Sequence, residues 1–296
     1  MLTPRMHTKP TPATPHLHLS FTKRLLARLL RPALAPLEAR VDSLKARLEH
    51  ELERTKLGIW RGGLEGSLIL PDGGDNLVLS TRLRQELAFW RRAVRIPGAH
   101  PAIDGSFDVV FGRWQRARLD DLALALELDA QAFAAWRRER SAVELGSGPY
   151  PMLAASTDAP WRWALAVDPL ADGYASEGLV VGPAASIPML AACAEAVPLP
   201  AACADLVVSE NALDHMIDPA RALAEMRRLL TPRGVLWLLV DLSETPDDMH
   251  PHPMSLDRLR GLLAEQKLEV IRERVTDHRS HPNALGDVRV LARPGT

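Results

Sequence analysis

Short apolar runs alternate with helical segments from residue 141 onward, and this alternation constrains the fold more than any other feature. It is typical of a parallel α/β sheet, because each crossover between parallel strands needs a helix. The last two runs are joined by a segment with Pro282, Asn283 and Gly286, which favours an antiparallel hairpin. We therefore predict a mostly parallel seven-stranded sheet that ends in this hairpin. The predicted strands lie near residues 142–145, 164–167, 189–193, 205–208, 235–240, 268–275 and 287–292.

The segment between the fourth and fifth predicted strands has helix signals at both ends. Asp218 is a favoured N-cap residue, and Pro219 suits the first turn of a helix. Leucine and methionine side chains then recur at helical spacing, and Pro232 and Gly234 are residues that end helices. We predict a helix that starts at Pro219 and ends before Pro232.

The chain before the sheet divides into three segments. Residues 1–20 are rich in Pro, Thr and His without periodicity, which predicts a disordered tail. Residues 21–57 are predicted to form a basic helical extension with a short coiled-coil seam. It favours contact with its own protein or a partner, and weak binding to an anionic membrane surface is the alternative. A helical hairpin or a weak homodimer remains open in place of the coiled coil. Residues 58–140 are predicted to be a linker and a helical lid, and residues 141–296 the domain that carries the chemistry.

Two of the helices predicted in the lid cover residues 83–94 and 119–138. All five phenylalanines of the chain lie before residue 140, and several stand near tryptophans. Aromatic residues at helical spacing usually pack against one another, and closure over a substrate is the alternative. We therefore expect an aromatic packing cluster in the lid.

The composition excludes several classes of protein. The 296 residues are 47% hydrophobic and 25% charged, which excludes wholesale disorder. The net charge of −1 does not favour a nucleic-acid-binding protein. The apolar runs are far shorter than the roughly 20 residues of a membrane-spanning helix. Cys193 and Cys203 form no CxxC pair, which favours a reduced compartment, so we predict a cytoplasmic protein.

A turn with two glycines follows the first predicted strand, in V-E-L-G-S-G at residues 143–148. Closely spaced glycines let a ligand approach backbone N–H groups. Asp168 ends the second strand, where a carboxylate can accept hydrogen bonds from both hydroxyls of a ribose. The pair predicts a nucleoside pocket, and the alternative is that Asp168 caps the turn before Pro169. A dinucleotide fingerprint would need a glycine where Pro151 stands, which argues against a nicotinamide or flavin dinucleotide.

Four ordered motifs resemble those of the class I S-adenosylmethionine-dependent methyltransferases, in particular the type 11 group that acts on small molecules. V-E-L-G-S-G is similar to the family's first motif, and A-V-D-P to its second. A-E-A-V-P-L-P followed by A-D-L-V-V resembles its third and fourth strands with the adenine-side loop, and A-L-D-H through L-L-T-P-R-G its usual ending. The resemblance covers about residues 141–294 and implies a Rossmann-like fold.

The resemblance also implies that S-adenosylmethionine is the cofactor. The glycine turn would contact its methionine part, Asp168 its ribose, and the segment after the third strand its adenine. The implied cofactor-binding residues are Glu144, Gly146, Ser147, Gly148, Asp168, Cys193, Ala194 and Glu195. Tyr150 stands where a third glycine is common in the family, and Cys193 where an aspartate is common. These departures keep open a second interpretation, a catalytically silent binding protein with this fold.

Methyl transfer from a sulfonium is an in-line displacement, and it needs a base where the acceptor must lose a proton. His215 follows the fourth strand and belongs to the one residue type whose ordinary pKa, about 6.5, lies near neutrality, so it is the predicted base. The alternative is that His215 only packs or caps there. Glu210 is a second candidate base, and Asn211 is predicted to orient the substrate. Nothing like N-P-P-Y, the motif of amide and nucleobase N-methyltransferases, follows this strand, so we predict a hydroxyl acceptor on a small molecule, sugar or glycan and no nucleic acid.

A loop rich in acidic and histidine residues, D-D-M-H-P-H-P at residues 247–253, follows the fifth predicted strand. Together with Asp214 it offers donor atoms of the kind that divalent metal ions take. An ordinary loop that shapes the acceptor pocket is the simpler interpretation. We therefore predict no metal site from the sequence.

Overall fold

The fold is described from a computed structural model, which covers residues 76–95, 107–155, 160–280 and 283–295. The predictions for residues 1–57 lie outside these described residues. So does the beginning of the predicted linker and lid segment.

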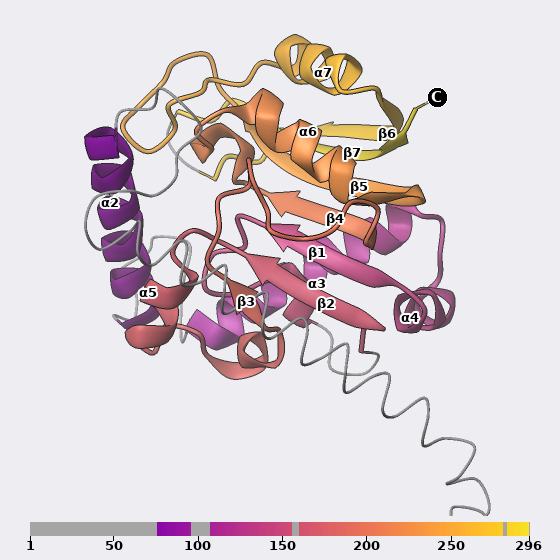
Figure 1. Ribbon diagram of the computed structural model, residues 1–296, viewed down its shortest axis with the longest axis horizontal. Coiled ribbons are helices and arrows are strands. Elements are labelled where there is room, and N and C mark those ends of the chain that lie inside the picture. The colour runs from indigo at the N-terminus through magenta and orange to yellow at the C-terminus, as the bar shows by residue number, and fades with distance from the viewer. Residues whose placement is uncertain (1–75, 96–106, 156–159, 281–282, 296) are drawn as a thin grey trace, which may run out of the picture. The chain divides into compact units, whose positions relative to one another are not determined.

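A seven-stranded sheet forms the centre of the described structure (Figure 1). Its strand order is β3-β2-β1-β4-β5-β7-β6, and β7 alone runs antiparallel to its neighbours. The fold is therefore the Rossmann-like sheet with a C-terminal antiparallel pair that the sequence predicts, although the third strand is shorter than expected. The strands are β1 (Ser141–Leu145), β2 (Trp163–Val167), β3 (Met189–Leu190), β4 (Ala204–Glu210), β5 (Leu230–Leu242), β6 (Leu268–Thr276) and β7 (Gly286–Pro294).

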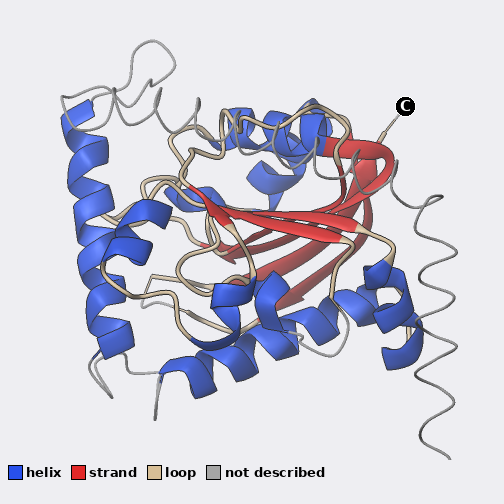
Figure 2. Ribbon diagram, turned by 60° about the horizontal axis from the view of Figure 1, so that its bottom comes forward, coloured by secondary structure: helices blue, strands red, loops and turns tan. Residues whose placement is uncertain are grey.

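Helices cover both faces of the sheet, and one helix, α2, stands across the ends of the strands (Figure 2). The α-helices are α2 (Asn76–Arg95), α3 (Phe107–Ala125), α4 (Ala130–Arg138), α5 (Ala171–Ser176), α6 (Pro219–Leu229) and α7 (Leu256–Glu265), and the 3-10 helices are η1 (Met152–Ala155), η2 (Gly182–Ser186) and η3 (Leu213–His215). The parallel strands β1, β2 and β4 point their carboxyl ends toward α2 (Figure 1). Within the described residues, no helix is long and apolar enough to cross a membrane.

The predicted helix between β4 and β5 is confirmed as α6. The Asp218 side chain caps it by accepting hydrogen bonds from the backbone N–H groups of Ala220 and Arg221, at 2.9 and 3.2 Å. Pro232 and Gly234 do not lie in a loop, however, because β5 begins directly after the helix. The pairing of β4 with β5 is irregular over this stretch, which is where a strand tolerates proline.

The prediction of one helix over residues 119–138 is wrong. The helix α3 ends at Ala125, and Glu127 takes a left-handed conformation with φ 58°. A new helix, α4, then begins, capped by the Asp129 side chain, which accepts the N–H of Ala132 at 2.8 Å. The apolar periodicity continues through this break, so only the cap at Asp129 marks the start of the second helix.

The helices α3 and α4 share a core with the sheet. It combines helical leucines and a phenylalanine with strand residues and two tryptophans, so burial of apolar surface fixes this pair of helices against β1, β4 and β5. Its larger members are Leu119, Leu122, Phe133, Met152, Leu153, Trp161, Leu206, Val208, Trp237 and Leu291.

Gly286 is a glycine that the β6–β7 pair requires. A Cβ at this position would lie 2.3 Å from the carbonyl oxygen of Thr276. We expect Gly286→Ala to lower the free energy of unfolding by about 1–3 kcal/mol, measured by urea denaturation. Gly261→Ala is the matched control, because this glycine lies in α7 with no atom within 4 Å of the added Cβ. It should raise stability by up to about 1 kcal/mol, and equal effects of both variants would contradict the account.

Candidate functional site

The predicted glycine turn and Asp168 lie together at the carboxyl edge of β1 and β2. Gly146 and Gly148 have φ values of 69° and 59°, a region that favours glycine. Asp168 Oδ2 accepts the backbone N–H of Gly148 at 3.0 Å, and its Oδ1 accepts that of Leu170 at 2.8 Å. Burial raises the pKa of Asp168 to about 6, although these N–H groups and the Tyr174 phenol favour the charged form.

The segment after β4 packs directly on this turn. A Cβ at Gly146 would lie 2.5 Å from the Cβ of Ala212 and 3.8 Å from the Cε of Met216. The turn is also held to β2, because the Gly146 N–H donates to the carbonyl of Val167 at 2.8 Å. The backbone of the turn and the loop that carries His215 are therefore neighbours.

Glu144 and Ser147 make their hydrogen bonds within the protein. Both carboxylate oxygens of Glu144 accept backbone N–H groups, from Met152 at 2.9 Å and Leu153 at 3.0 Å. Burial raises the pKa of Glu144 to about 8, and the two N–H groups oppose that shift. The Ser147 hydroxyl donates to the carbonyl of Gly148 at 3.0 Å. Glu144 thus fixes the short helix η1 behind the turn, and its contact with a cofactor stays a prediction.

The predicted adenine-side residues lie after β3. Glu195 Oε1 accepts the backbone N–H groups of Ile217 and Asp218, at 2.8 and 3.2 Å, and so ties this segment to the start of α6. Ala194 is buried, and Cys193 is half-buried. Burial raises the pKa of the Cys193 thiol to about 12, so it stays neutral at pH 7.

Tyr150 lies in an aromatic cluster between the lid and η1 rather than in the glycine turn. Its side chain is 1% exposed, and its ring centroid lies 6.0 Å from that of Phe111. Phe111 also contacts the rings of Trp90 and Trp114, with centroids 5.5 Å away in each case. The Tyr150 carbonyl accepts the side-chain amide of Gln115 at 2.6 Å. The expected aromatic packing in the lid is confirmed.

The helix α2 brings two side chains to the site that no motif singled out. A Cβ at Gly148 would lie 3.1 Å from the indole ring of Trp90. The Trp90 indole N–H donates to Glu86 at 2.7 Å. Burial and the nearby Asp168 carboxylate raise the pKa of Glu86 to about 7, and His250 opposes the rise. Only the tertiary placement of α2 reveals these contacts, so no local sequence signal exists for them.

The helix α2 is held against α5. The Arg91 guanidinium donates to both carboxylate oxygens of Glu177, and Arg95 donates to its backbone carbonyl at 2.6 Å. Leu87 packs close to Gly173, where a Cβ would lie 3.4 Å from its side chain. The arginine contacts are exposed, so α2 is fastened mainly by its apolar face.

Two of the predicted catalytic residues are bound within the protein. Glu210 accepts the indole N–H of Trp237 at 2.9 Å and lies 3.4 Å from a guanidinium nitrogen of Arg118. Burial raises its pKa, and Arg118 opposes that shift. The side-chain amide of Asn211, oriented so that its nitrogen donates, reaches Asp241 at 2.6 Å. Both residues are therefore better placed to shape the loop after β4 than to contact a substrate.

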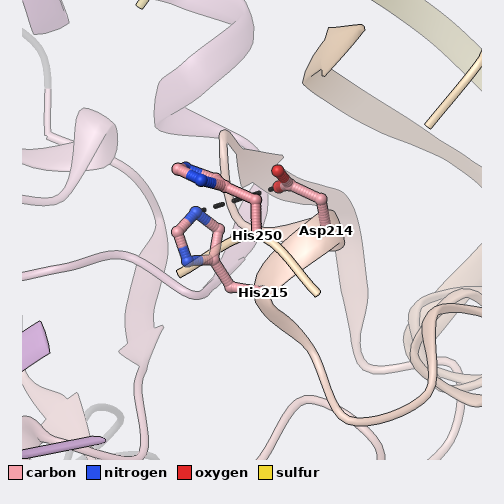
Figure 3. Close-up of side chains that lie close together, drawn as sticks. All are labelled: Asp214, His215 and His250. Carbon is pink, nitrogen blue, oxygen red and sulfur yellow. Dashed lines mark ion pairs between the residues drawn. The ribbon is translucent and has the colours of Figure 1, made fainter. Parts of the chain in front are cut away.

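His215 lies in a cluster with Asp214 and His250 (Figure 3). Its Nε2 is 3.9 Å from Oδ1 of Asp214, and the centroids of the two imidazole rings are 4.6 Å apart in an edge-to-face arrangement. His250 Nδ1 lies 2.8 Å from Oδ1 of Asp247. His215 is partly exposed, whereas Glu210 is buried. The cluster unites donor atoms from the loops after β4 and β5.

Comparison with family models covers the central part of this site. Residues 145–238 match a family described as a methyltransferase domain. The match includes the glycine turn, Asp168 and His215, and it ends within β5. No curated protein matches the chain significantly.

Several solved structures share the fold at low sequence identity. A Burkholderia thailandensis 1,6-didemethyltoxoflavin N1-methyltransferase, solved with its substrate and S-adenosylhomocysteine, is 14% identical with a TM-score of 0.52, over 77% of this chain and 94% of that one. A Leishmania major S-adenosylmethionine-dependent methyltransferase is 13% identical with a TM-score of 0.51, over 75% and 87%. The [4+2]-cyclase SpnF is 15% identical with a TM-score of 0.50, over 75% and 96%.

Proposed function

Because residues 145–238 belong to the class I S-adenosylmethionine-dependent methyltransferases, we propose that this enzyme methylates a hydroxyl group of a small molecule, a sugar or a glycan. The observation that carries this proposal is the hydrogen bond from the Gly148 N–H to Asp168. It holds a ribose-binding carboxylate against a backbone turn, one loop away from His215. The Burkholderia enzyme, an N1-methyltransferase of 1,6-didemethyltoxoflavin, supports a small-molecule acceptor but not the choice of oxygen.

The residues present fit S-adenosylmethionine. A carboxylate offers about four acceptor positions, and Asp168 uses three of them for Gly148, Leu170 and the Tyr174 phenol. One ribose hydroxyl takes the remaining acceptor position of Asp168. The other ribose hydroxyl takes a second position when it replaces the Tyr174 phenol as donor. Trp90 provides an aromatic surface beside Gly148. The binding-protein interpretation depended on Tyr150 and Cys193: the Tyr150 side chain packs into the aromatic cluster, and Cys193 stays a departure from the family's pattern.

S-adenosylmethionine supplies a methyl group on a positively charged sulfur. The protein must align the acceptor with this group, and it must promote loss of the hydroxyl proton. We propose His215 for the second task, because it is partly exposed on the segment that packs against the glycine turn. Glu210 is less suited, because Trp237 and Arg118 already bind its carboxylate.

Cofactor affinity should depend on pH through Asp168. Its pKa is raised to about 6, and only the ionised carboxylate accepts from both ribose hydroxyls. As pH falls below 6 the ionised fraction falls, so the dissociation constant of S-adenosylmethionine should rise about tenfold between pH 7.5 and pH 5. Calorimetric titrations at these two values measure the change. Asp168→Asn should bind weakly with no such dependence, whereas Glu86→Gln should retain it.

Transfer of a labelled methyl group tests the proposed function. The purified chain is incubated with methyl-deuterated S-adenosylmethionine and a metabolite extract that includes sugars and glycans, and products are analysed by mass spectrometry. We expect labelled products whose fragmentation places the methyl group on oxygen, and far less product with Asp168→Ala at subsaturating cofactor. Labelled N-methyl products alone would contradict the hydroxyl acceptor. Cofactor binding without any labelled product would favour the silent binding protein.

We also propose that the enzyme works in the cytoplasm without a nucleic-acid partner. Cys193 and Cys203 are free thiols, which suits a reducing compartment. The balanced charge of the chain supports a small neutral or polar acceptor over a polyanion. Labelling of total nucleic acid by the same assay would contradict this.

A further inference from the structure

We propose that Asp214, His215 and His250 bind one divalent transition-metal ion that holds the acceptor hydroxyl. One ligand atom from each residue lies within 4.8 Å of the other two (Figure 3). Two imidazoles and a carboxylate form a donor set that suits Zn²⁺, Fe²⁺, Mn²⁺ or Ni²⁺. The proposal rests on the proposed function and specifies how its acceptor is bound.

The state of Asp214 points to a cation. Its side chain is fully buried, at 0% exposure, and neither carboxylate oxygen accepts a hydrogen bond from another described residue. The imidazole of His215 approaches only to 3.9 Å. A buried carboxylate that accepts no hydrogen bond from another residue is costly, and a metal ion between it and the imidazoles removes that cost. A protonated, neutral Asp214 is the alternative that the experiment must separate.

His250 is held as metal-binding histidines usually are. Its Nδ1 lies 2.8 Å from Oδ1 of Asp247. Because the carboxylate accepts this hydrogen bond, Nδ1 carries the proton of the neutral ring and Nε2 carries the lone pair. Asp247 is itself fixed by the backbone N–H groups of Met249 and His250 and by the side-chain amide of Asn283. Such a carboxylate orients the ring and makes its other nitrogen a better ligand.

The spacing of the ligand atoms is close to that of a metal site. Ligands of a tetrahedral ion with bonds of about 2.1 Å lie about 3.4 Å apart. The present separations of at most 4.8 Å must therefore close by about 1.4 Å or less when an ion binds. Three protein ligands leave a fourth position for the acceptor oxygen.

The charges around the cluster are mainly negative. Asp241 and Asp247 act on Asp214 from the end of β5 and the following loop, and Glu86 acts on it from α2. This field favours a bound cation. It also excludes an anionic ligand from the same position.

The ion explains how the acceptor loses its proton. A hydroxyl bound to the metal has a lowered pKa and releases its proton to water. The oxygen lone pair then forms the bond to the methyl carbon while the carbon–sulfur bond breaks, and the sulfur keeps that electron pair. When the ion is bound, His215 promotes loss of the hydroxyl proton as a ligand of the ion rather than as the base.

Metal titration of the full-length chain tests the site. Chelator-treated protein is titrated with Co²⁺, followed by visible absorption, and with Zn²⁺, followed by calorimetry. We expect one ion per chain, with binding at least about tenfold weaker in His250→Ala and Asp214→Asn. His252→Ala is the matched control, because this histidine lies on the same loop but binds the backbone carbonyl of Ile217. Its affinity should match that of the unmodified chain.

Two further measurements keep the outcomes distinct. Asp247→Asn leaves all three ligands in place and should weaken binding about tenfold, which covers the case that Asp214→Asn does not fold. Absence of Co²⁺ binding, or equal binding by all variants, overturns the proposal. Unchanged methyl transfer by metal-free protein overturns the role of the ion and leaves the proposed function intact. If the unmodified chain binds one ion that the variants do not bind, but shows no methyl transfer, the proposed function is refuted and the metal site is retained.

Discussion

Replacing Asp168 by alanine should weaken S-adenosylmethionine binding by about 2–3 kcal/mol, or about 30- to 160-fold. The carboxylate is the hydrogen-bond acceptor that faces the glycine turn, and bonds between a hydroxyl and a charged acceptor are stronger than neutral ones. Its loss also leaves the N–H groups of Gly148 and Leu170 without their acceptor, so the turn loses its shape. Calorimetric titration of the purified variant measures the dissociation constant.

Two variants separate ribose binding from general damage. Asp168→Asn retains one carbonyl acceptor and should bind more tightly than Asp168→Ala but more weakly than the unmodified chain. Tyr174→Phe removes a phenol that competes for the same carboxylate, so its affinity should change by less than about threefold. An Asp168→Ala protein that folds and binds the cofactor normally would refute the assignment of this residue.

The central strands could be predicted because each is a local apolar run buried on both faces, as in β1 and β4. All seven predicted runs coincide with strands, although β6 is mostly exposed. The division between α3 and α4 could not be found from periodicity, because the apolar spacing continues through the break. It depends on the cap at Asp129 and the left-handed residue Glu127.

The candidate site could be predicted only for residues that belong to a local sequence motif. The glycine turn and Asp168 follow from strand ends, and the structure joins them by a hydrogen bond. Trp90 and Glu86 reach the turn from a helix more than 50 residues earlier, and helix packing rather than sequence pattern decides that contact. The pairing of His215 with His250 likewise depends on how two loops meet at the sheet edge. The sequence already grouped Asp214 with the loop at residues 247–253, but its burial without a hydrogen bond from another described residue is visible only in the structure.

The second large effect is expected for His215→Ala. Loss of the group that promotes proton removal should lower kcat by about 10²- to 10⁴-fold at pH 7.5. The cofactor dissociation constant should change by less than about threefold, because the imidazole does not bond the glycine turn or Asp168. Initial rates of methyl transfer and a parallel cofactor titration measure the two quantities.

A split between rate and affinity distinguishes this role from a structural one. A histidine that only packs in the turn before α6 would, when removed, lower stability and cofactor affinity with little change in kcat. His278→Ala, an exposed histidine between β6 and β7, is the control and should leave kcat and affinity unchanged. Partial recovery of kcat in His215→Ala on addition of imidazole would show that the missing group is the ring itself. A kcat within about threefold of the unmodified enzyme would exclude His215 from the chemistry, and the hydroxyl would then have to lose its proton by another route.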